Sequence, residues 1–108
     1  MKKRTSNIIV PKKYLSQNFL VNNRTIHRII DACKIIQGET ILEIGPGLGA
    51  LTKEIVKHTD RIFAVETDKK LYDYLICDNN LSKAHFMHAD FLKHELSFLP
   101  KKTKVIGN

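Results

Sequence analysis

The sequence predicts an α/β fold built on a mainly parallel sheet. Short apolar runs alternate with segments of helical periodicity, a pattern that calls for right-handed crossovers between parallel strands. The first apolar run ends in a turn with three glycines at alternate positions, and a helical segment follows at once. The last apolar run, at residues 103–106, has no element after it, so we expect the N-terminal half of a larger sheet.

The first helix is expected to begin at an N-cap, Asn22 or Asn23, and to end at Gly38. Apolar residues recur in it at spacings of three and four, which predicts one buried face. That face comprises Ile26, Ile29, Ile30, Cys33 and Ile36.

Strands and helices alternate after this first helix. Apolar runs predict buried strands at 40–44 and 61–66, a weaker third strand at 84–88 and the start of a fourth strand at 103–106. A helix is predicted at 50–58, and a short irregular helical turn within 91–99. Asp68 is expected to cap a further helix that turns Leu71, Leu75 and Ile76 toward the sheet.

The composition fits one globular domain, and its charge is unevenly placed. The chain has 108 residues, 43% hydrophobic and 27% charged, with a net charge of +7. Residues 1–30 contain seven Lys or Arg and no Asp or Glu, so the remainder is neutral. We expect residues 1–13 to form a basic arm that binds a polyanion such as RNA; the alternative is a solvated tail that keeps the protein soluble. The candidate RNA-binding residues are Lys2, Lys3, Arg4, Lys12 and Lys13.

Other sequence features favour a cytoplasmic protein. Cys33 and Cys77 lie far apart without metal-ligand spacing, which argues against a disulfide framework and for a reducing compartment. The apolar run at residues 8–10 stops at Pro11 and is too short for a signal core. No run approaches the roughly 18 apolar residues of a membrane span.

The glycine turn at 45–49 is expected to hold a nucleotide-like cofactor. Gly45, Gly47 and Ala50 satisfy a relaxed dinucleotide-binding pattern, and Glu66 lies 21 residues beyond Gly45, where a ribose-binding acid belongs. These facts fit NAD and S-adenosylmethionine equally well.

Three further features favour S-adenosylmethionine. Glu43 precedes the turn and suits a cationic ligand, whereas it would repel a pyrophosphate. Gly49 would let the backbone lie along the ligand, and Asp90 could accept from an adenine amino group. The alternatives are solvated strand-end carboxylates for Glu43 and Glu66, and a helix N-cap for Asp90.

A set of motifs carries a resemblance to a known family. The motifs are Leu-Ser-Gln-Asn-Phe-Leu at 15–20, Glu-Ile-Gly-Pro-Gly-Leu-Gly-Ala-Leu-Thr at 43–52, Val-Glu-x-Asp at 65–68, Ala-Asp at 89–90 and Ile-Gly-Asn at 106–108. Together they resemble the ribosomal RNA adenine N6-dimethyltransferases, the kasugamycin-sensitivity enzymes, from about Lys12 to the last residue. The related erythromycin-resistance methyltransferases usually have Gly-Lys-Gly-His where this chain has Gly-Leu-Gly-Ala at 47–50.

The resemblance implies a Rossmann-like class I S-adenosylmethionine-dependent methyltransferase fold, with residues 14–108 as the N-terminal part of the catalytic domain. The implied activity is dimethylation of the N6 amines of two adjacent adenosines in 16S ribosomal RNA, by a monomer that needs no metal. Asn108 matches the first residue of the family's Asn-Leu-Pro-Tyr catalytic motif and would accept from the target amine. The implied cofactor-binding residues are Asn18, Leu20, Gly45, Glu66, Asp90 and Asn108.

Three alternatives to this function remain open. One is a 23S ribosomal RNA methyltransferase of the erythromycin-resistance type, and another is a catalytically silent module that binds RNA or cofactor. The third, a nicotinamide-dependent oxidoreductase, is disfavoured by Glu43 and Gly49. We expect the 108 residues alone to bind cofactor weakly and to transfer no methyl groups.

Overall fold

A four-stranded parallel sheet lies at the centre of the structure, a computed structural model that describes residues 22–93 and 96–107. Its strands are β1 (Ile41–Ile44), β2 (Ile62–Glu66), β3 (His85–His88) and β4 (Lys104–Gly107). They are ordered β3-β2-β1-β4, and every neighbouring pair runs parallel. The predicted parallel α/β fold is therefore confirmed, and the carboxyl ends of all four strands meet at one edge.

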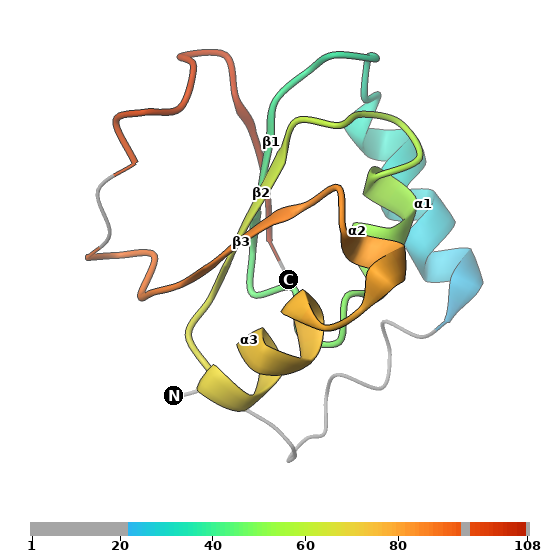
Figure 1. The fold of residues 1–108 in the computed structure, drawn as a ribbon. Coiled ribbons are helices and arrows are strands. Elements are labelled where there is room, and N and C mark those ends of the chain that lie inside the picture. The colour runs from blue at the N-terminus through green and yellow to red at the C-terminus, as the bar shows by residue number, and fades with distance from the viewer. Residues whose placement is uncertain (1–21, 94–95, 108) are drawn as a thin grey trace.

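The helices pack on one side of this sheet, and the described parts of the segment from β3 to β4 lie on the other (Figure 1). They are α1 (Asn23–Cys33), α2 (Ala50–Ile55), α3 (Lys69–Ile76) and a short 3-10 helix, η2 (Asn79–Leu81). The side chain of Asn22 accepts from the first-turn N–H groups of α1, and the side chain of Asp68 does the same for α3. Both predicted N-caps are thus confirmed.

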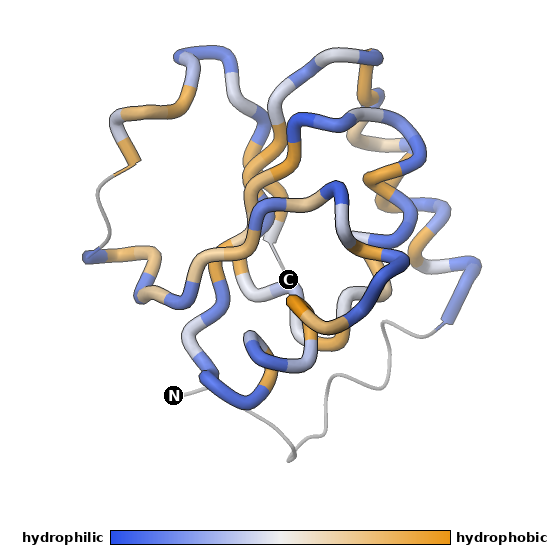
Figure 2. The backbone as a smooth tube through the Cα atoms, in the orientation of Figure 1, coloured by the Kyte–Doolittle hydropathy of each residue, from blue (hydrophilic) through white to orange (hydrophobic). Residues whose placement is uncertain are grey.

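The hydrophobic core lies between the helices and the sheet. Ile26 and Ile30 of α1 and Leu51 and Ile55 of α2 are buried against strand residues of β1, β2 and β4. Figure 2 shows hydrophobic colours along the central strands and hydrophilic colours in many of the outer turns. This core fixes α2 on β1, so the turn between them has a defined position.

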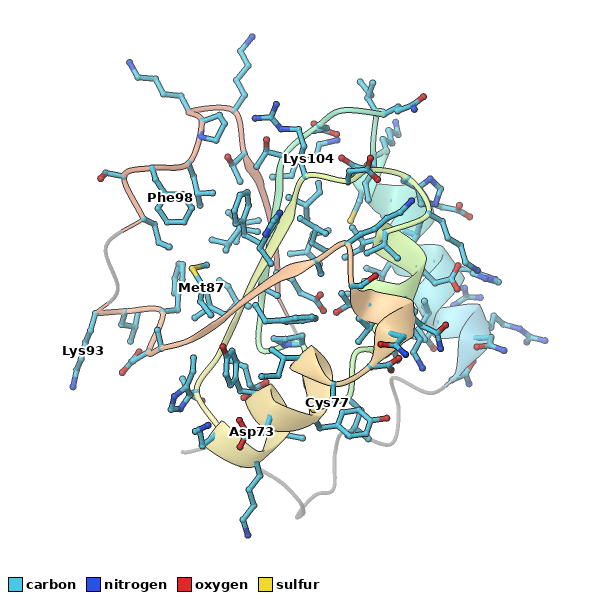
Figure 3. All side chains as sticks on the ribbon, in the orientation of Figure 1. Asp73, Cys77, Met87, Lys93, Phe98 and Lys104 are labelled. Atoms are coloured by element: carbon cyan, nitrogen blue, oxygen red, sulfur yellow. The ribbon has the colours of Figure 1, made fainter. Side chains whose placement is uncertain are left out.

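The opposite face of the sheet is covered by the chain between β3 and β4. The Phe98 ring meets the Phe63 ring edge-on at 5.4 Å, and His85 stacks on Phe63 at 5.1 Å. Phe98 and Met87 lie on this side in Figure 3. Val105 of β4 remains 57% exposed, so the cover is incomplete there.

The predicted end of the first helix is wrong. The helix α1 ends at Cys33, because Lys34 adopts a left-handed conformation with φ of 49°, and Gly38 lies in a later turn. The ammonium of Lys104 donates to the carbonyls of Cys33 at 2.6 Å and Lys34 at 2.9 Å, which satisfies free carbonyls at the helix end. Ile36 therefore lies beyond the helix and is exposed rather than on its buried face.

Three further boundary or burial predictions also need correction. The helix α2 ends at Ile55, and residues 56–58 form a turn. The hydroxyl of Thr59, directly after this turn, donates to the carbonyl of Glu39 at 2.6 Å. Ile76 at the end of α3 is exposed, while Leu75 is buried. The described part of 91–99 consists of turns and bends rather than a helical turn.

No helix in the described ranges is long and apolar enough to cross a membrane.

Candidate functional site

The candidate site lies at the edge of the sheet where the four strands end. The glycine turn follows β1, Glu66 is the last residue of β2, and Asp90 comes two residues after β3. The N–H of Gly45 donates to the carbonyl of Val65 at 2.9 Å, and the N–H of Ala89 donates to that of Glu66 at 3.1 Å. These bonds extend the strand pairing by one residue and bring the predicted site residues of three strands together.

Two of the three glycines leave open space in the turn. Gly45 and Gly47 have φ of 69° and 61°, and a Cβ atom added at either would meet nothing within 4 Å. This bare backbone is what the sequence predicts for a turn that a ligand approaches closely.

Gly49 has a packing role that the sequence analysis did not predict. A Cβ atom on it would lie 2.7 Å from Leu81 Cδ1 and 3.1 Å from Leu75 Cδ2, and its φ is 86°. Its missing side chain therefore leaves room for Leu81 of η2 and Leu75 of α3. Sequence spacing alone does not reveal this, because the two leucines belong to elements that follow much later in the chain.

Glu66 is buried, with 5% of its surface exposed, so it is not a solvated strand-end carboxylate. Its Oε1 accepts from the N–H of Gly47 at 3.1 Å, and its Oε2 accepts from the N–H of Asp68 at 2.9 Å. Burial raises the pKa of Glu66, and the backbone N–H groups of Asp68 and Gly47 oppose that rise. Because a carboxylate has about four acceptor positions, Glu66 keeps the capacity to accept from a ligand's hydroxyls.

Glu43 is also buried, with 3% of its surface exposed. Its Oε1 accepts from Thr52 Oγ1 at 2.5 Å, and no hydrogen bond from the described residues reaches Oε2. Burial raises its pKa to about 7, with a further contribution from Glu66, while the Thr52 hydroxyl lowers it. A buried carboxylate oxygen without a donor is costly, so a cationic ligand beside it would be favoured.

Thr52 is a site residue that the sequence analysis missed. It is fully buried on the first turn of α2, which the core holds against β1. A hydroxyl nine residues after an acid at a strand end is the available signal, but it becomes meaningful only when the strand and helix are packed.

Asp90 is exposed, and its Oδ1 accepts from the N–H of Leu92 at 2.9 Å. This bond closes a turn. The carboxylate accepts from a nearby N–H as a helix cap would, but the segment that follows is not a helix. Asp90 also carries Oδ2, and it lies two residues beyond β3, the strand that pairs with β2.

The other predicted site residues lie outside the described ranges. These are the cofactor residues Asn18 and Leu20, the catalytic candidate Asn108, and the basic-arm residues Lys2, Lys3, Arg4, Lys12 and Lys13. No group of three or more metal-ligating side chains occurs among the residues that the structure describes.

The chemistry of the described site is that of a binding surface made of acceptors. Open glycine backbone, the Glu66 carboxylate and the Oε2 of Glu43, to which no described residue donates, together offer room, diol acceptors and negative charge. Such a set of acceptors fits S-adenosylmethionine, which carries a ribose diol, an adenine amine and positive charge. It fits a pyrophosphate poorly, because two buried acids would repel it.

Comparison with known proteins gives a consistent result. A profile of the family described as "Ribosomal RNA adenine dimethylase" matches residues 10–108. The chain is 39% identical over 98 residues to a probable ribosomal RNA small subunit methyltransferase A of Thermococcus sibiricus, covering 91% of this chain and 35% of that protein. It is 39% identical over 89 residues to the corresponding enzyme of Mycoplasmoides gallisepticum, covering 82% and 32%. The chain thus spans about a third of the length of these relatives.

Solved structures show the same fold. The 23S rRNA methyltransferase ErmE superposes with a TM-score of 0.69 at 27% identity, covering 80% of this chain and 35% of ErmE. A dimethyladenosine transferase of Plasmodium falciparum gives 0.68 at 22% identity, covering 81% and 32%. Coclaurine N-methyltransferase, solved with S-adenosylhomocysteine, gives 0.59 at 25% identity, covering 69% and 24%. The Rossmann-like class I methyltransferase fold expected from the motifs is confirmed.

Proposed function

The chain belongs to the ribosomal RNA adenine dimethylase family, and from this premise we propose that it forms the cofactor-binding part of an S-adenosylmethionine-dependent enzyme. The proposed reaction is dimethylation of adenine N6 amines in small-subunit ribosomal RNA. The observation that carries the proposal is the open turn at Gly45 and Gly47 with the Glu66 carboxylate bonded to it.

Each described site residue has a role in this proposal. Gly45 and Gly47 provide backbone that the cofactor can approach, and Glu66 accepts from the ribose hydroxyls. Asp90 accepts from the adenine amine at the neighbouring strand end. Glu43, when ionised, supplies negative charge for the cationic methionine portion through Oε2, to which none of the described residues donates. Asn18 and Leu20 are proposed to contact the same portion.

The bound cofactor would supply a methyl group on a positively charged sulfur. The exocyclic amine of adenine is a weak nucleophile, so catalysis would come from placement and from acceptors for the amine hydrogens as positive charge develops. Asn108 directly follows β4, whose last residue pairs with Ile44 beside the glycine turn. We propose its side-chain oxygen as that acceptor.

The RNA substrate is proposed from the relatives. The Thermococcus and Mycoplasmoides proteins are named as small-subunit methyltransferases, and the basic arm would neutralise phosphates without reading sequence. We propose 16S ribosomal RNA in a small-subunit precursor as the substrate of the whole protein. A cytoplasmic monomer is the form that we propose to act on it, in ribosome biogenesis.

Cofactor identity can be tested on the 108-residue chain by calorimetry. We expect S-adenosylhomocysteine to bind, weakly, and NAD to give no binding heat. Glu66→Ala should abolish the binding of S-adenosylhomocysteine, whereas Asp60→Ala, which removes an exposed carboxylate paired with Lys83, should not change it. Binding of NAD instead would favour the oxidoreductase alternative.

The substrate can be tested with a chimera in which residues 10–108 replace the aligned segment of the Thermococcus sibiricus relative. We expect it to form N6,N6-dimethyladenosine in 16S RNA of unmethylated small subunits, detected by nuclease digestion and mass spectrometry. The same chimera with Glu66→Ala should form none. Methylation of 23S RNA instead would support the erythromycin-resistance type, and cofactor binding without any methylation would support the silent module.

A further inference from the structure

His88 makes a contact that the proposed function does not use. It is the last residue of β3 and pairs in register with Glu66 of β2. Its Nε2 lies 3.1 Å from the carbonyl oxygen of Thr67, to which it can donate. The backbone ladder between the two strands ends with Ala89 N–H donating to the Glu66 carbonyl. The imidazole therefore adds one more link beyond the end of the ladder.

The ring of His88 is held in place from a second side. Its centroid lies 5.6 Å from that of Tyr72, on the first turns of α3, with an angle of 34° between the ring planes. The ammonium of Lys69 lies 5.5 Å from the centre of the Tyr72 ring and bonds Asp73 at 2.6 Å. The histidine side chain is thus held against α3 as well as against the loop that precedes it.

The position of this link relates it to the site. Thr67 directly follows Glu66, whose carboxylate binds the glycine turn. His88 lies two residues before Asp90. One side chain therefore joins the two segments that carry the proposed ribose acid and the proposed adenine acid.

We propose that His88 is a positioning residue that sets the distance between Glu66 and Asp90 and so makes the site selective for adenine over other bases. The inference rests on the proposed function, because it assumes that the two acids hold the two ends of an adenosyl group. With the ribose fixed at Glu66, an acceptor at Asp90 favours the 6-amino group of adenine. A base with a carbonyl at that position presents an acceptor to the carboxylate and is rejected only if Asp90 is held in place.

The test compares two ligands that differ only at this position, S-adenosyl-L-homocysteine and S-inosyl-L-homocysteine. Dissociation constants are measured by calorimetry for the 108-residue chain and its variants. We expect the unmodified protein to favour the adenosyl compound by at least about tenfold, as a site built around one hydrogen bond does. His88→Ala should lower this preference by about fivefold, the scale of one lost hydrogen bond.

Two variants separate positioning from a general effect on folding. His88→Gln places an amide donor near the position of Nε2 and should restore the preference to within about twofold of the unmodified protein. His85→Ala removes the other histidine of β3, whose ring stacks on Phe63 on the other face of the sheet. This variant should leave the preference unchanged. Amide spectra of each variant show whether it is folded.

The outcomes distinguish this inference from the proposed function. If the unmodified protein binds neither compound, the proposed function fails. If it binds and discriminates, and folded His88→Ala discriminates equally well, the positioning role of His88 is refuted while the function stands. Binding without discrimination refutes the inference too. If His88→Ala does not fold, a preference in His88→Gln that matches the unmodified protein supports the inference, and a lost preference in that folded variant overturns it.

Discussion

The N–H of Gly47 donates to Oε1 of Glu66 at 3.1 Å, and this bond ties the open turn after β1 to the end of β2. The other carboxylate oxygen accepts from the N–H of Asp68, the N-cap of α3. The acid proposed to hold the ribose therefore also holds the turn that the cofactor would approach. In this proposal, structure and binding depend on the same side chain, Glu66.

Removing the Glu66 carboxylate should lower stability. Glu66→Ala leaves two partly buried N–H groups without an acceptor, and each costs about 1–3 kcal/mol. We expect the free energy of unfolding in urea to fall by about 2–6 kcal/mol. Asp73→Ala, which breaks one exposed ion pair, should change it by less than about 0.5 kcal/mol. Equal stability of the two variants would show that the Gly47–Glu66 link contributes nothing.

The glycines of the turn should differ in what they tolerate. Gly49→Ala places a methyl group 2.7 Å from Leu81 in a left-handed conformation, so both crowding and strain oppose it. We expect a loss of about 3 kcal/mol or more in the free energy of unfolding. Gly47→Ala meets only the strain of its positive φ, about 1–2 kcal/mol.

Ligand binding should follow the opposite order. Folded Gly47→Ala should lose affinity for S-adenosylhomocysteine, because its methyl group enters the open space of the turn. Gly49→Ala should lower the free energy of unfolding. Its apparent affinity for S-adenosylhomocysteine should fall only in proportion to the fraction of protein that is unfolded. A Gly47→Ala protein with unchanged affinity would mean that the ligand does not approach this backbone.

Stability should fall as pH rises through the titration of Glu43. The pKa of this carboxyl is about 7 in the folded protein and 4.5 for an ordinary glutamate, so the folded state binds the proton more tightly than the unfolded chain does. The stabilisation is therefore fully present below the lower value and is lost between the two, and the cost above pH 7 is on the order of 3 kcal/mol. Thr52 and Glu66 are the groups that face this carboxylate, and only the Thr52 hydroxyl opposes the shift.

Urea denaturation between about pH 5 and pH 8 measures this effect. The free energy of unfolding of the unmodified protein, minus that of Glu43→Gln, should fall over this range. Glu39→Gln is a control that should show no change over this range, because the Ile36 N–H lowers the pKa of Glu39 and its titration lies below pH 5. A pH-independent difference for Glu43→Gln would place that carboxylate in contact with water.

The basic arm should make RNA binding sensitive to salt. Neutralising Lys2, Lys3, Arg4, Lys12 and Lys13 to Gln should reduce the slope of log affinity against log salt by up to about 4. Filter binding to a small-subunit RNA fragment at several salt concentrations measures it. An unchanged slope would assign the arm to solubility instead.

The fold could be predicted from local patterns because each strand and cap depends on nearby residues. Asn22 and Asp68 accept from N–H groups two and three residues away, so their capping role can be predicted from the sequence. The end of α1 could not be predicted in this way. It is completed by Lys104, about 70 residues later, whose ammonium bonds the last carbonyls.

The site also combines features that the sequence predicts with features that only the packing of the elements decides. The positions of the glycine turn, Glu66 and Asp90 follow from the order of strands, and the structure brings these segments together. The pairing of Glu43 with Thr52 and the packing of Gly49 on Leu81 depend on how α2 and η2 settle on the sheet. Spacing in the sequence cannot supply that information.

Amide chemical shifts of the 108-residue chain during titration with S-adenosylhomocysteine test the central claim most directly. The account predicts shifts at Gly45, Gly47, Thr67 and Asp90, with small changes in α1, and no comparable shifts with NAD. Shifts produced by NAD at these residues, or S-adenosylhomocysteine shifts confined to other surfaces, would contradict it.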